Sequence, residues 1–237
     1  GVSSAASDVY KRQVKGRRVG SIRIEQQVKD ATEAYVALIL DAAAGGVRVL
    51  MAGEGGMEVE ALPPGALKSA LCDPEIGALR TTVDRLAAEI GGSRSAALAD
   101  AGKRLAKVFI DAEAMLVEVN PLFIKADGTW VAGDAKLVND DNALERQAAL
   151  TDMLKRRSTA YTEAALKMEH GFDYVVVDPE GEIGLLTTGA GLSMMLIDEL
   201  RTMGLKPYNF LDVRTGGLRG EITRLVKVLE WIQRGPK

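Results

Sequence analysis

The chain has 237 residues, of which 47% are hydrophobic and 27% are charged, as is usual for a globular protein. Its net charge of −3 gives no electrostatic reason to expect nucleic acid or an anionic membrane as a partner. No apolar run approaches the roughly 18 to 20 residues of a membrane span. A single cysteine and a single histidine exclude an internal disulfide, a multi-cysteine zinc site and catalysis by paired histidines. We therefore expect a cytoplasmic protein whose chemistry uses carboxylates, amides, glycines and lysines.

The first part of the chain contains strand patterns after a short polar segment. Residues 1–13 are small and polar and show neither apolar period, so we expect a non-native or disordered leader. Alternation of apolar and polar residues predicts a short strand over 21–25. Two apolar runs, 35–40 and 47–51, flank a Gly-Gly turn at 45–46 and predict a hairpin.

Helical periodicity and a second hairpin follow. Apolar residues at helical spacing predict one helix over 79–90, ended by a Gly-Gly pair, and a second over about 98–109. The apolar segments 115–125 and 129–138 flank the turn sequence Ala-Asp-Gly at 126–128, which predicts a strong hairpin.

The last third of the chain alternates helix and strand, the pattern of a parallel sheet with crossover helices. The elements predicted from about residue 142 onward are helices over 142–156, 158–169 and 191–203, strands over 173–177, 183–187 and 209–213, and a closing helix from about 220. We expect an α/β protein with a domain boundary near residue 157, which separates a domain over 14–157 from one over 158–237.

The second hairpin brings polar side chains together. A turn centred on Asp127 places Asn120 opposite Asp134, and Glu118 opposite Lys136. Opposed side chains have Cβ atoms about 5 Å apart, and alternation puts these four groups on one face. The other face is predicted to be core, and its residues are Val117, Val119, Phe123, Val131, Ala135 and Leu137.

Two interpretations of this polar face are open. An amide oxygen and a carboxylate oxygen at that separation can share a hard cation such as Mg²⁺, which completes its shell with water and substrate phosphates. Lys136 then supplies positive charge for the phosphates, and Glu118 a second acid near the reacting group. The same pattern is also that of an ordinary hairpin with one solvated face and a Glu–Lys pair.

Three glycine-containing turns are candidates for binding anions. Residues 54–56 (EGG) follow a predicted strand, and 187–191 (TTGAG) lie between a strand and a helix start. The pair at 216–217 lies at the next strand-to-helix turn. Backbone amides at such turns, and the N-terminus of a following helix, bind phosphate or carboxylate groups. Tight turns that need a positive φ have the same composition.

Several motifs in the same order resemble one family, the beta subunits of succinyl-CoA synthetase (ADP-forming succinate–CoA ligase). The resemblance covers about residues 20–220. The matching segments are 54–60 (EGGMEVE), 118–122 (EVNPL), 133–137 (GDAKL), 141–144 (DNAL), 188–192 (TGAGL) and 209–213 (NFLDV). It implies a partial ATP-grasp domain followed by the N-terminal part of a flavodoxin-like CoA-ligase domain.

The resemblance also implies roles for individual residues. Asn120 and Asp134 match the family's magnesium ligands, and Glu118 matches a glutamate that meets the phosphorylated histidine of the partner subunit. The nucleotide-binding positions are implied to be Glu25, Val28, Glu33, Glu54, Gly55 and Gly56. The substrate-binding positions are implied to be Thr188, Gly189, Gly191, Arg214, Gly216 and Gly217.

The reaction that the resemblance implies uses Mg²⁺ and ATP to activate a small carboxylic acid. The phosphoryl group passes through a phosphohistidine of an alpha-like, CoA-binding partner, and a CoA thioester forms within a hetero-oligomer. Phosphoryl transfer of this kind depends mainly on positioning and electrostatic stabilisation. Neither nucleic acid nor a membrane is an expected partner.

Departures from the family pattern leave alternatives open. The family's beta subunits are longer at both ends, so we expect this chain to be a fragment that is inactive alone. Thr188 stands where the family has Asn, and 214–220 (RTGGLRG) stands where it has a glycine run. The two added arginines suit a more anionic acid, such as malate, citrate or a sulfonated acid. A catalytically incomplete nucleotide-binding or assembly module is the alternative function.

Overall fold

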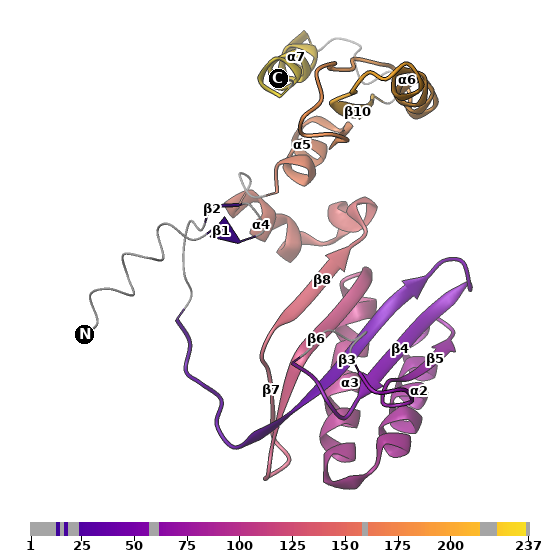
Figure 1. Ribbon diagram of the computed structural model, residues 1–237, viewed down its shortest axis with the longest axis vertical. Helices are drawn as coiled ribbons and strands as arrows, with labels where there is room; N and C mark the ends of the chain where they lie inside the picture. The colour runs from indigo at the N-terminus through magenta and orange to yellow at the C-terminus, as the bar shows by residue number, and fades with distance from the viewer. Residues whose placement is uncertain are drawn as a thin grey trace, which may run out of the picture. The chain divides into compact units, whose positions relative to one another are not determined.

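The computed structural model divides the chain into two compact units (Figure 1). The first unit comprises Gly1–Ala106 and Glu118–Lys136, and the second comprises Lys107–Val117 and Leu137–Lys237. The predicted boundary near residue 157 stays a prediction. The residues that the structure describes are 13–14, 17–18, 24–56, 62–157, 161–213 and 222–235.

The N-terminal segment differs from expectation where it is described. Most of the predicted leader lies outside the described residues, but Gln13 begins a two-residue strand, β1 (Gln13–Val14), which pairs antiparallel with β2 (Arg17–Arg18). The strand expected over 21–25 is not formed at Ile24 and Glu25, which have no strand pairing, and residues 21–23 lie outside the described part.

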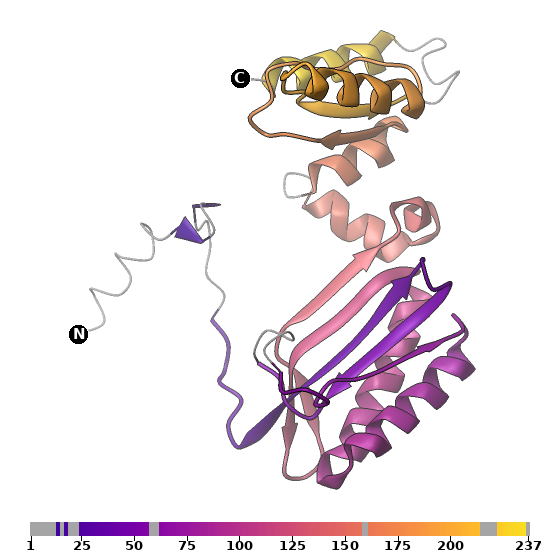
Figure 2. The same cartoon turned by 45° about the vertical axis from the view of Figure 1, so that its right-hand side comes forward.

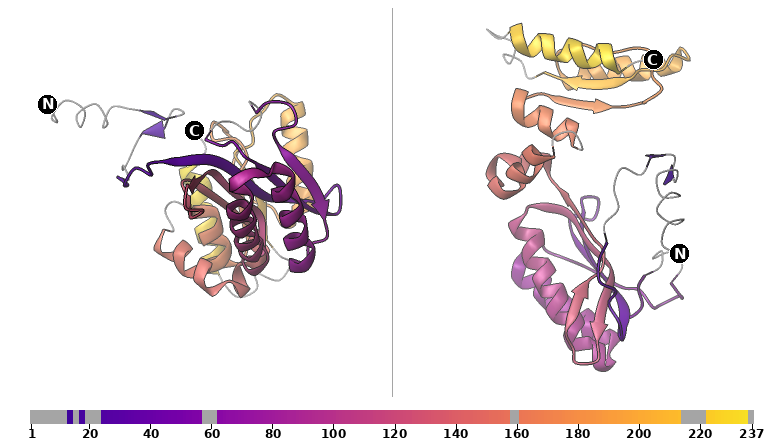
Figure 3. Two further views of the ribbon diagram at one scale, coloured as in Figure 1. Left: turned by 90° about the horizontal axis from the view of Figure 1, so that it is seen from below. Right: turned by 90° about the vertical axis from the view of Figure 1, so that its left-hand side faces the viewer.

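Within the described residues, six strands form one sheet, and two helices cover one of its faces (Figures 2 and 3). Most of its residues belong to the first unit, but residues 114–117 of β6 and 137–139 of β8 belong to the second. The strand order is β5–β4–β3–β6–β7, and β8 pairs with β6. The strands are β3 (Ala31–Asp41), β4 (Gly46–Ala52), β5 (Lys68–Cys72), β6 (Ala114–Lys125), β7 (Trp130–Ala132) and β8 (Ala135–Asn139). The sequence patterns missed β5.

The β3–β4 hairpin, which the sequence predicted, provides the central strand of the sheet. β3 is buried without interruption from Ala34 to Leu38. Alternate residues of this run face opposite sides. On one side, Tyr35 and Ala37 pack with Leu62 and Leu67 from the loop before β5. Both faces of β3 are thus covered, which explains its continuous apolar sequence.

The two helices predicted between the hairpins are confirmed as α2 (Ile76–Ile90) and α3 (Ser95–Asp111), with a short 3-10 helix η2 (Gly92–Arg94) between them. α2 buries Leu79, Val83 and Leu86, the residues whose spacing predicted it. It ends at Gly91, whose φ of 69° lies in the region that favours glycine.

The register predicted for the second hairpin is also confirmed. Gly128 has a φ of 81° and donates its N–H to the Lys125 carbonyl at 3.0 Å, as in a three-residue hairpin loop. The cross-strand partners are symmetric about Asp127: Leu122 with Ala132, Phe123 with Val131, and Ile124 with Trp130.

The hydrogen-bond alternation of this hairpin breaks at Asn120. The Lys125 N–H donates to Thr129 at 2.9 Å, and the Pro121 carbonyl accepts from Gly133 at 2.9 Å, so the bonded positions of β6 are odd-numbered. The next bond runs from the Asn120 N–H to the Asp134 carbonyl at 3.1 Å, one residue early. A local irregularity of this kind reverses which side chains face the core.

The prediction of a single core face along this hairpin is therefore wrong. Val117 and Val119 are buried as expected, but beyond the irregularity the buried residues are Leu122 and Ile124. The other residues predicted for the core are half-buried in the case of Phe123 and exposed in the case of Val131, Ala135 and Leu137.

The second unit contains the helices predicted for the last third of the chain. The segment predicted as one helix over 142–156 is split into η3 (Asp141–Arg146) and α4 (Ala148–Arg156). The remaining elements are α5 (Thr162–His170), β9 (Asp173–Val176), α6 (Ala190–Thr202), β10 (Asn209–Asp212) and α7 (Ile222–Arg234). Its buried cluster is Phe172, Tyr174, Leu211, Val213 and Val228, with Trp231 packed against it.

The α/β class is confirmed, but the parallel pairing predicted for this unit is wrong for β9 and β10. These strands pair antiparallel, with Asn209 opposite Val176 and Asp212 opposite Asp173. The predicted strand over 183–187 makes only one parallel bridge, between Ile183 and Pro207. Instead of a strand neighbour, Leu185 has the side-chain amide of Asn209 as its hydrogen-bond partner.

Candidate functional site

The Gly55–Gly56 turn lies against strand β3 in the first unit. A Cβ atom on Gly55 would overlap the backbone carbonyl of Ala34, which is fully buried. Gly56 has a φ of 75°, and a Cβ atom there would overlap the carboxylate of Glu33. Gly55 is therefore needed for close approach to the β3 backbone, and Gly56 for its positive φ. The turn places its backbone beside a carboxylate.

Asn120 lies next to this turn and next to Asp134. Its side-chain Oδ1 accepts a hydrogen bond from the Gly56 N–H at 2.8 Å. Its own backbone N–H donates to the Asp134 carbonyl. The structure thus brings Glu33 and Gly56 together with the hairpin residues Asn120 and Asp134, and 64 residues of sequence separate Gly56 from Asn120.

The oxygen donors of this cluster fit the Mg²⁺ that the family pattern implies. Asn120 contributes an amide oxygen whose orientation is set by the Gly56 N–H. Asp134, whose backbone carbonyl accepts from the Asn120 N–H, carries the carboxylate of the predicted pair. Within the described residues, no group of three or more histidine, cysteine or acidic side chains could hold a metal ion. Two protein oxygens agree with the habit of Mg²⁺, which keeps several waters and takes substrate phosphates as further ligands.

Glu118 and Lys136 lie on the adjacent strands β6 and β8. Glu118 is half-buried and Lys136 is exposed. No salt bridge joins them within 62–157, a stretch that the structure describes without a gap. The cross-strand ion pair of an ordinary hairpin is thus not formed.

A groove separate from the Asn120 cluster lies at the C-terminal end of β6. Gln26, Gln27, Val28 and Lys29 line a cavity of about 620 Å³ together with Lys125 and Val131. Val28 was among the predicted nucleotide contacts, and Glu25 precedes this segment with an exposed side chain. Lys29 and Lys125 were not singled out from the sequence, because each lysine carries no pattern of its own until the fold brings the two segments together.

In the second unit, the predicted substrate turn precedes helix α6. Gly189 has a φ of 93° and caps the helix, while Thr188 is exposed and Gly191 lies in its first turn. The first turn of a helix offers unpaired N–H groups and positive dipole to a carboxylate. Arg214, Gly216 and Gly217, also predicted to bind substrate, lie outside the described residues.

A buried polar network fixes this turn. Thr187 and Ser193 contact each other through their hydroxyls, and both donate to the Leu211 carbonyl. Asn209, which is fully buried, accepts from the Leu185 N–H at 2.8 Å and donates to the Leu185 carbonyl at 2.9 Å. Sequence reasoning missed these roles, although a polar residue inside an apolar strand segment is a signal for such a network.

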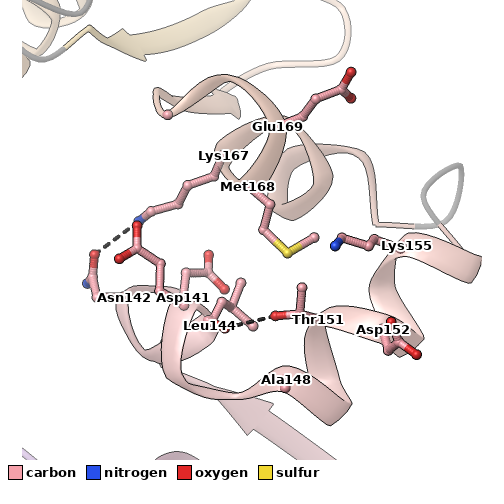
Figure 4. A pocket seen from close by; sticks show the side chains of 12 residues that line it. Asp141, Asn142, Leu144, Ala148, Thr151, Asp152, Lys155, Lys167, Met168 and Glu169 are labelled. Atoms are coloured by element: carbon pink, nitrogen blue, oxygen red, sulfur yellow. Dashed lines mark hydrogen bonds between the residues drawn. The ribbon is translucent and has the colours of Figure 1, made fainter.

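A second groove, of about 600 Å³, lies between η3, α4 and α5 (Figure 4). Lys167 points into it and lies 3.0 Å from the Asn142 side-chain oxygen and 2.7 Å from the Asp173 carboxylate. None of the predicted site residues lines this groove.

The N-terminal half of the chain matches a known domain family. Residues 5–124 match the ATP-grasp domain family, and the chain belongs to that family.

Particular relatives are similar along most of the chain. The beta subunit of an ADP-forming succinate–CoA ligase from Desulfurococcus amylolyticus is 33% identical over 229 residues, which are 94% of this chain and 59% of that protein. The corresponding subunit of Pasteurella multocida is 32% identical over 225 residues, which are 93% of this chain and 57% of that protein. The chain thus spans little more than half the length of these relatives.

Among solved structures, ATP citrate lyase from Methanothrix soehngenii, in complex with citrate and coenzyme A, has a similar fold. The TM-score is 0.57 at 17% identity, with 80% of this chain and 47% of that chain covered. This likeness supports the α/β fold. None of the helices that the structure describes has the length and hydropathy needed to cross a membrane.

Proposed function

We propose that this chain is part of a beta-like subunit of an ADP-forming carboxylate–CoA ligase. Such an enzyme uses Mg²⁺ and ATP to activate a small carboxylic acid for thioester formation with CoA. An alpha-like partner would bind CoA and carry the histidine that is phosphorylated during the reaction. The family membership and the similarity to succinate–CoA ligase beta subunits support this class of reaction.

The observation that carries the proposal is the convergence of Asn120 and Asp134 beside the Gly55–Gly56 turn. Asn120 and Asp134 would hold Mg²⁺, which when bound neutralises charge on the phosphates. Lys136 adds a positive charge beside the same phosphates, and Glu118 would orient the partner's histidine. This division of roles suits phosphoryl transfer, in which positioning and electrostatics supply most of the rate.

The nucleotide would lie along β6. Asn120 and Lys125 are separated by about 16 Å along the strand, at roughly 3.3 Å per residue. An extended nucleotide can therefore reach from the metal ligands to the groove of Val28, Lys29 and Lys125. Glu25 would contact the base side of the nucleotide, and Glu33 would lie at the metal end, beside Gly56.

The carboxylic acid would bind at the Thr188–Gly189 turn. Free N–H groups in the first turn of α6 favour a carboxylate, and the network around Asn209 and Thr187 holds the turn in place. Thr188 provides a hydroxyl where the resembling family has an amide. The acid is therefore proposed only as a small carboxylate, with succinate, malate and citrate as the members to test.

The test is calorimetric titration of the full chain with ADP in the presence and absence of Mg²⁺. We expect Mg²⁺ to strengthen ADP binding in the wild type, and we expect Asp134→Ala to abolish that gain while leaving the circular dichroism spectrum unchanged. Asp84→Ala is the matched control, because it removes the same charge from an exposed position on α2. Unchanged Mg²⁺ dependence in Asp134→Ala would remove the metal assignment.

A further inference from the structure

We propose that the Gly55–Gly56 turn is a positioning element for Asn120 and so sets the affinity of the site for a divalent cation. The alternative role for this turn is to bind a phosphate through its backbone amides. The inference rests on the proposed function and extends it, because it assigns the turn to the metal ligand instead of the nucleotide.

The Gly55–Gly56 turn lies directly against the backbone of β3. A Cβ atom on Gly55 would overlap the carbonyl carbon and oxygen of Ala34 and lie 3.0 Å from its nitrogen. Ala34 is fully buried in the central strand of the sheet, so its backbone has no room to shift. The position of the turn is therefore determined by the core of the first unit.

The Gly56 N–H is a hydrogen-bond donor to the Asn120 side chain. It donates to Asn120 Oδ1 at 2.8 Å, so this donor is already engaged. The bond fixes which end of the Asn120 amide is oxygen, and an amide oxygen carries two lone pairs, so it can accept this hydrogen bond and also coordinate a cation. Groups that hydrogen-bond a metal ligand in this way orient it and raise the affinity of the site for the metal.

The charge beside the Gly55–Gly56 turn is negative. The Glu33 carboxylate lies against the Gly56 backbone, at the place that a Cβ atom would occupy. A phosphate seated on the Gly56 amide would meet this negative charge directly. A cation bound beside Asn120 is attracted by the same carboxylate. The charge distribution therefore favours the positioning role over phosphate binding.

The experiment uses Mn²⁺ as the probe, because it takes oxygen ligands like Mg²⁺ and its free ion is measured by electron paramagnetic resonance. The full chain is titrated with MnCl₂ in the presence of ADP, and ADP binding is measured separately in EDTA. The variants are Gly55→Ala, which must push the turn away from β3, and Gly77→Ala, a control in which the new Cβ atom meets nothing within 4 Å. Asn120→Ala provides the reference for a lost ligand.

We expect Gly55→Ala to weaken Mn²⁺ binding on the order of 10- to 100-fold, the usual effect of losing a group that orients a metal ligand. Its ADP affinity in EDTA should stay at the wild-type value, and Gly77→Ala should match wild type in both assays. Wild-type Mn²⁺ affinity in Gly55→Ala overturns the inference. An equal loss of ADP affinity in EDTA also overturns it and assigns the turn to phosphate.

A second measurement tests the inference without the Gly55→Ala variant, in case that variant fails to fold. Hydrogen exchange of the Gly56 amide is followed by NMR in wild type, Asn120→Asp and Asn120→Ala. Protection should be lost in Asn120→Ala and kept in Asn120→Asp, which retains an oxygen acceptor. Unchanged protection in Asn120→Ala overturns the inference. A wild-type chain that binds no Mn²⁺ with ADP present refutes the metal site of the proposed function, and the inference with it.

Discussion

Replacing Asn209 with Ala tests whether one buried side-chain amide stabilises the segment that leads to the proposed carboxylate site. Its side chain makes two hydrogen bonds, of 2.8 and 2.9 Å, to the N–H and carbonyl of Leu185. Asn209→Ala removes both and leaves a buried donor and a buried acceptor without partners. Leu185 is only 7% exposed, so water has little access to these groups. Each unsatisfied group costs about 1–3 kcal/mol, and we expect a loss of about 3 kcal/mol in the free energy of unfolding of the second unit.

Tryptophan fluorescence can follow the unfolding of the second unit separately from the first. The chain has two tryptophans, Trp130 in the first unit and Trp231 in the second, where Trp231 packs against Phe172 and Tyr174. Urea unfolding monitored by fluorescence in a Trp130→Phe background therefore reports on the second unit.

Thr202→Ala is the control for the Asn209 experiment. It removes one exposed hydrogen bond, from Thr202 to the Asp198 carbonyl, and should change stability by no more than about 0.5 kcal/mol. If Asn209→Ala unfolds at the same urea concentration as Thr202→Ala, the argument from buried unsatisfied groups is refuted.

Two further predictions concern the hairpin that carries Asn120. Gly133→Ala places a Cβ atom 2.5 Å from Phe123 Cε2 and 2.9 Å from the Pro121 carbonyl oxygen, so it should destabilise the first unit by about 1–3 kcal/mol. Urea unfolding monitored by Trp130 fluorescence in a Trp231→Phe background measures this loss. Wild-type stability of the variant would contradict the prediction. The Trp130 indole N–H, and then Arg104, hold the pKa of Asp100 below its ordinary value of 3.8. A carboxyl group with a lowered pKa stabilises the folded state at pH values above its ordinary pKa, and this stabilisation is lost as the pH falls. The difference in the free energy of unfolding between wild type and Trp130→Phe should therefore become smaller below about pH 4. NMR titration should show a raised pKa of Asp100 in Trp130→Phe, and an unchanged pKa would refute the assignment.

Much of the local structure follows from the sequence alone. The spacing of Leu79, Val83 and Leu86 predicted α2, and the Gly91–Gly92 pair predicted its end. The turn at Asp127 and Gly128 predicted the hairpin register that places Asn120 beside Asp134. These features depend on residues close together in the chain, where side-chain periodicity and turn conformation are decisive.

The core face of the same hairpin could not be predicted. Its period-2 pattern reads as one continuous face, but the irregularity at Asn120 and Asp134 exchanges the two faces. The antiparallel pairing of β9 and β10 was missed for a similar reason. Alternating helices and strands are typical of parallel sheets, but strand direction is determined by pairing partners that the pattern does not contain.

Patterns in the sequence were enough to predict α2, α3, the two hairpins, the family and the polar residues Asn120 and Asp134. Two contacts are known only from the three-dimensional structure. Gly56 donates to Asn120, which lies 64 residues later in the chain, and Asn209 supports the turn before α6. The Gly56–Asn120 contact depends on how β3, β4 and β6 pack into one sheet, and the Asn209 contact depends on how β10 packs against the segment before α6. No local pattern encodes them, because the close approach of two backbones results from the packing of the whole unit.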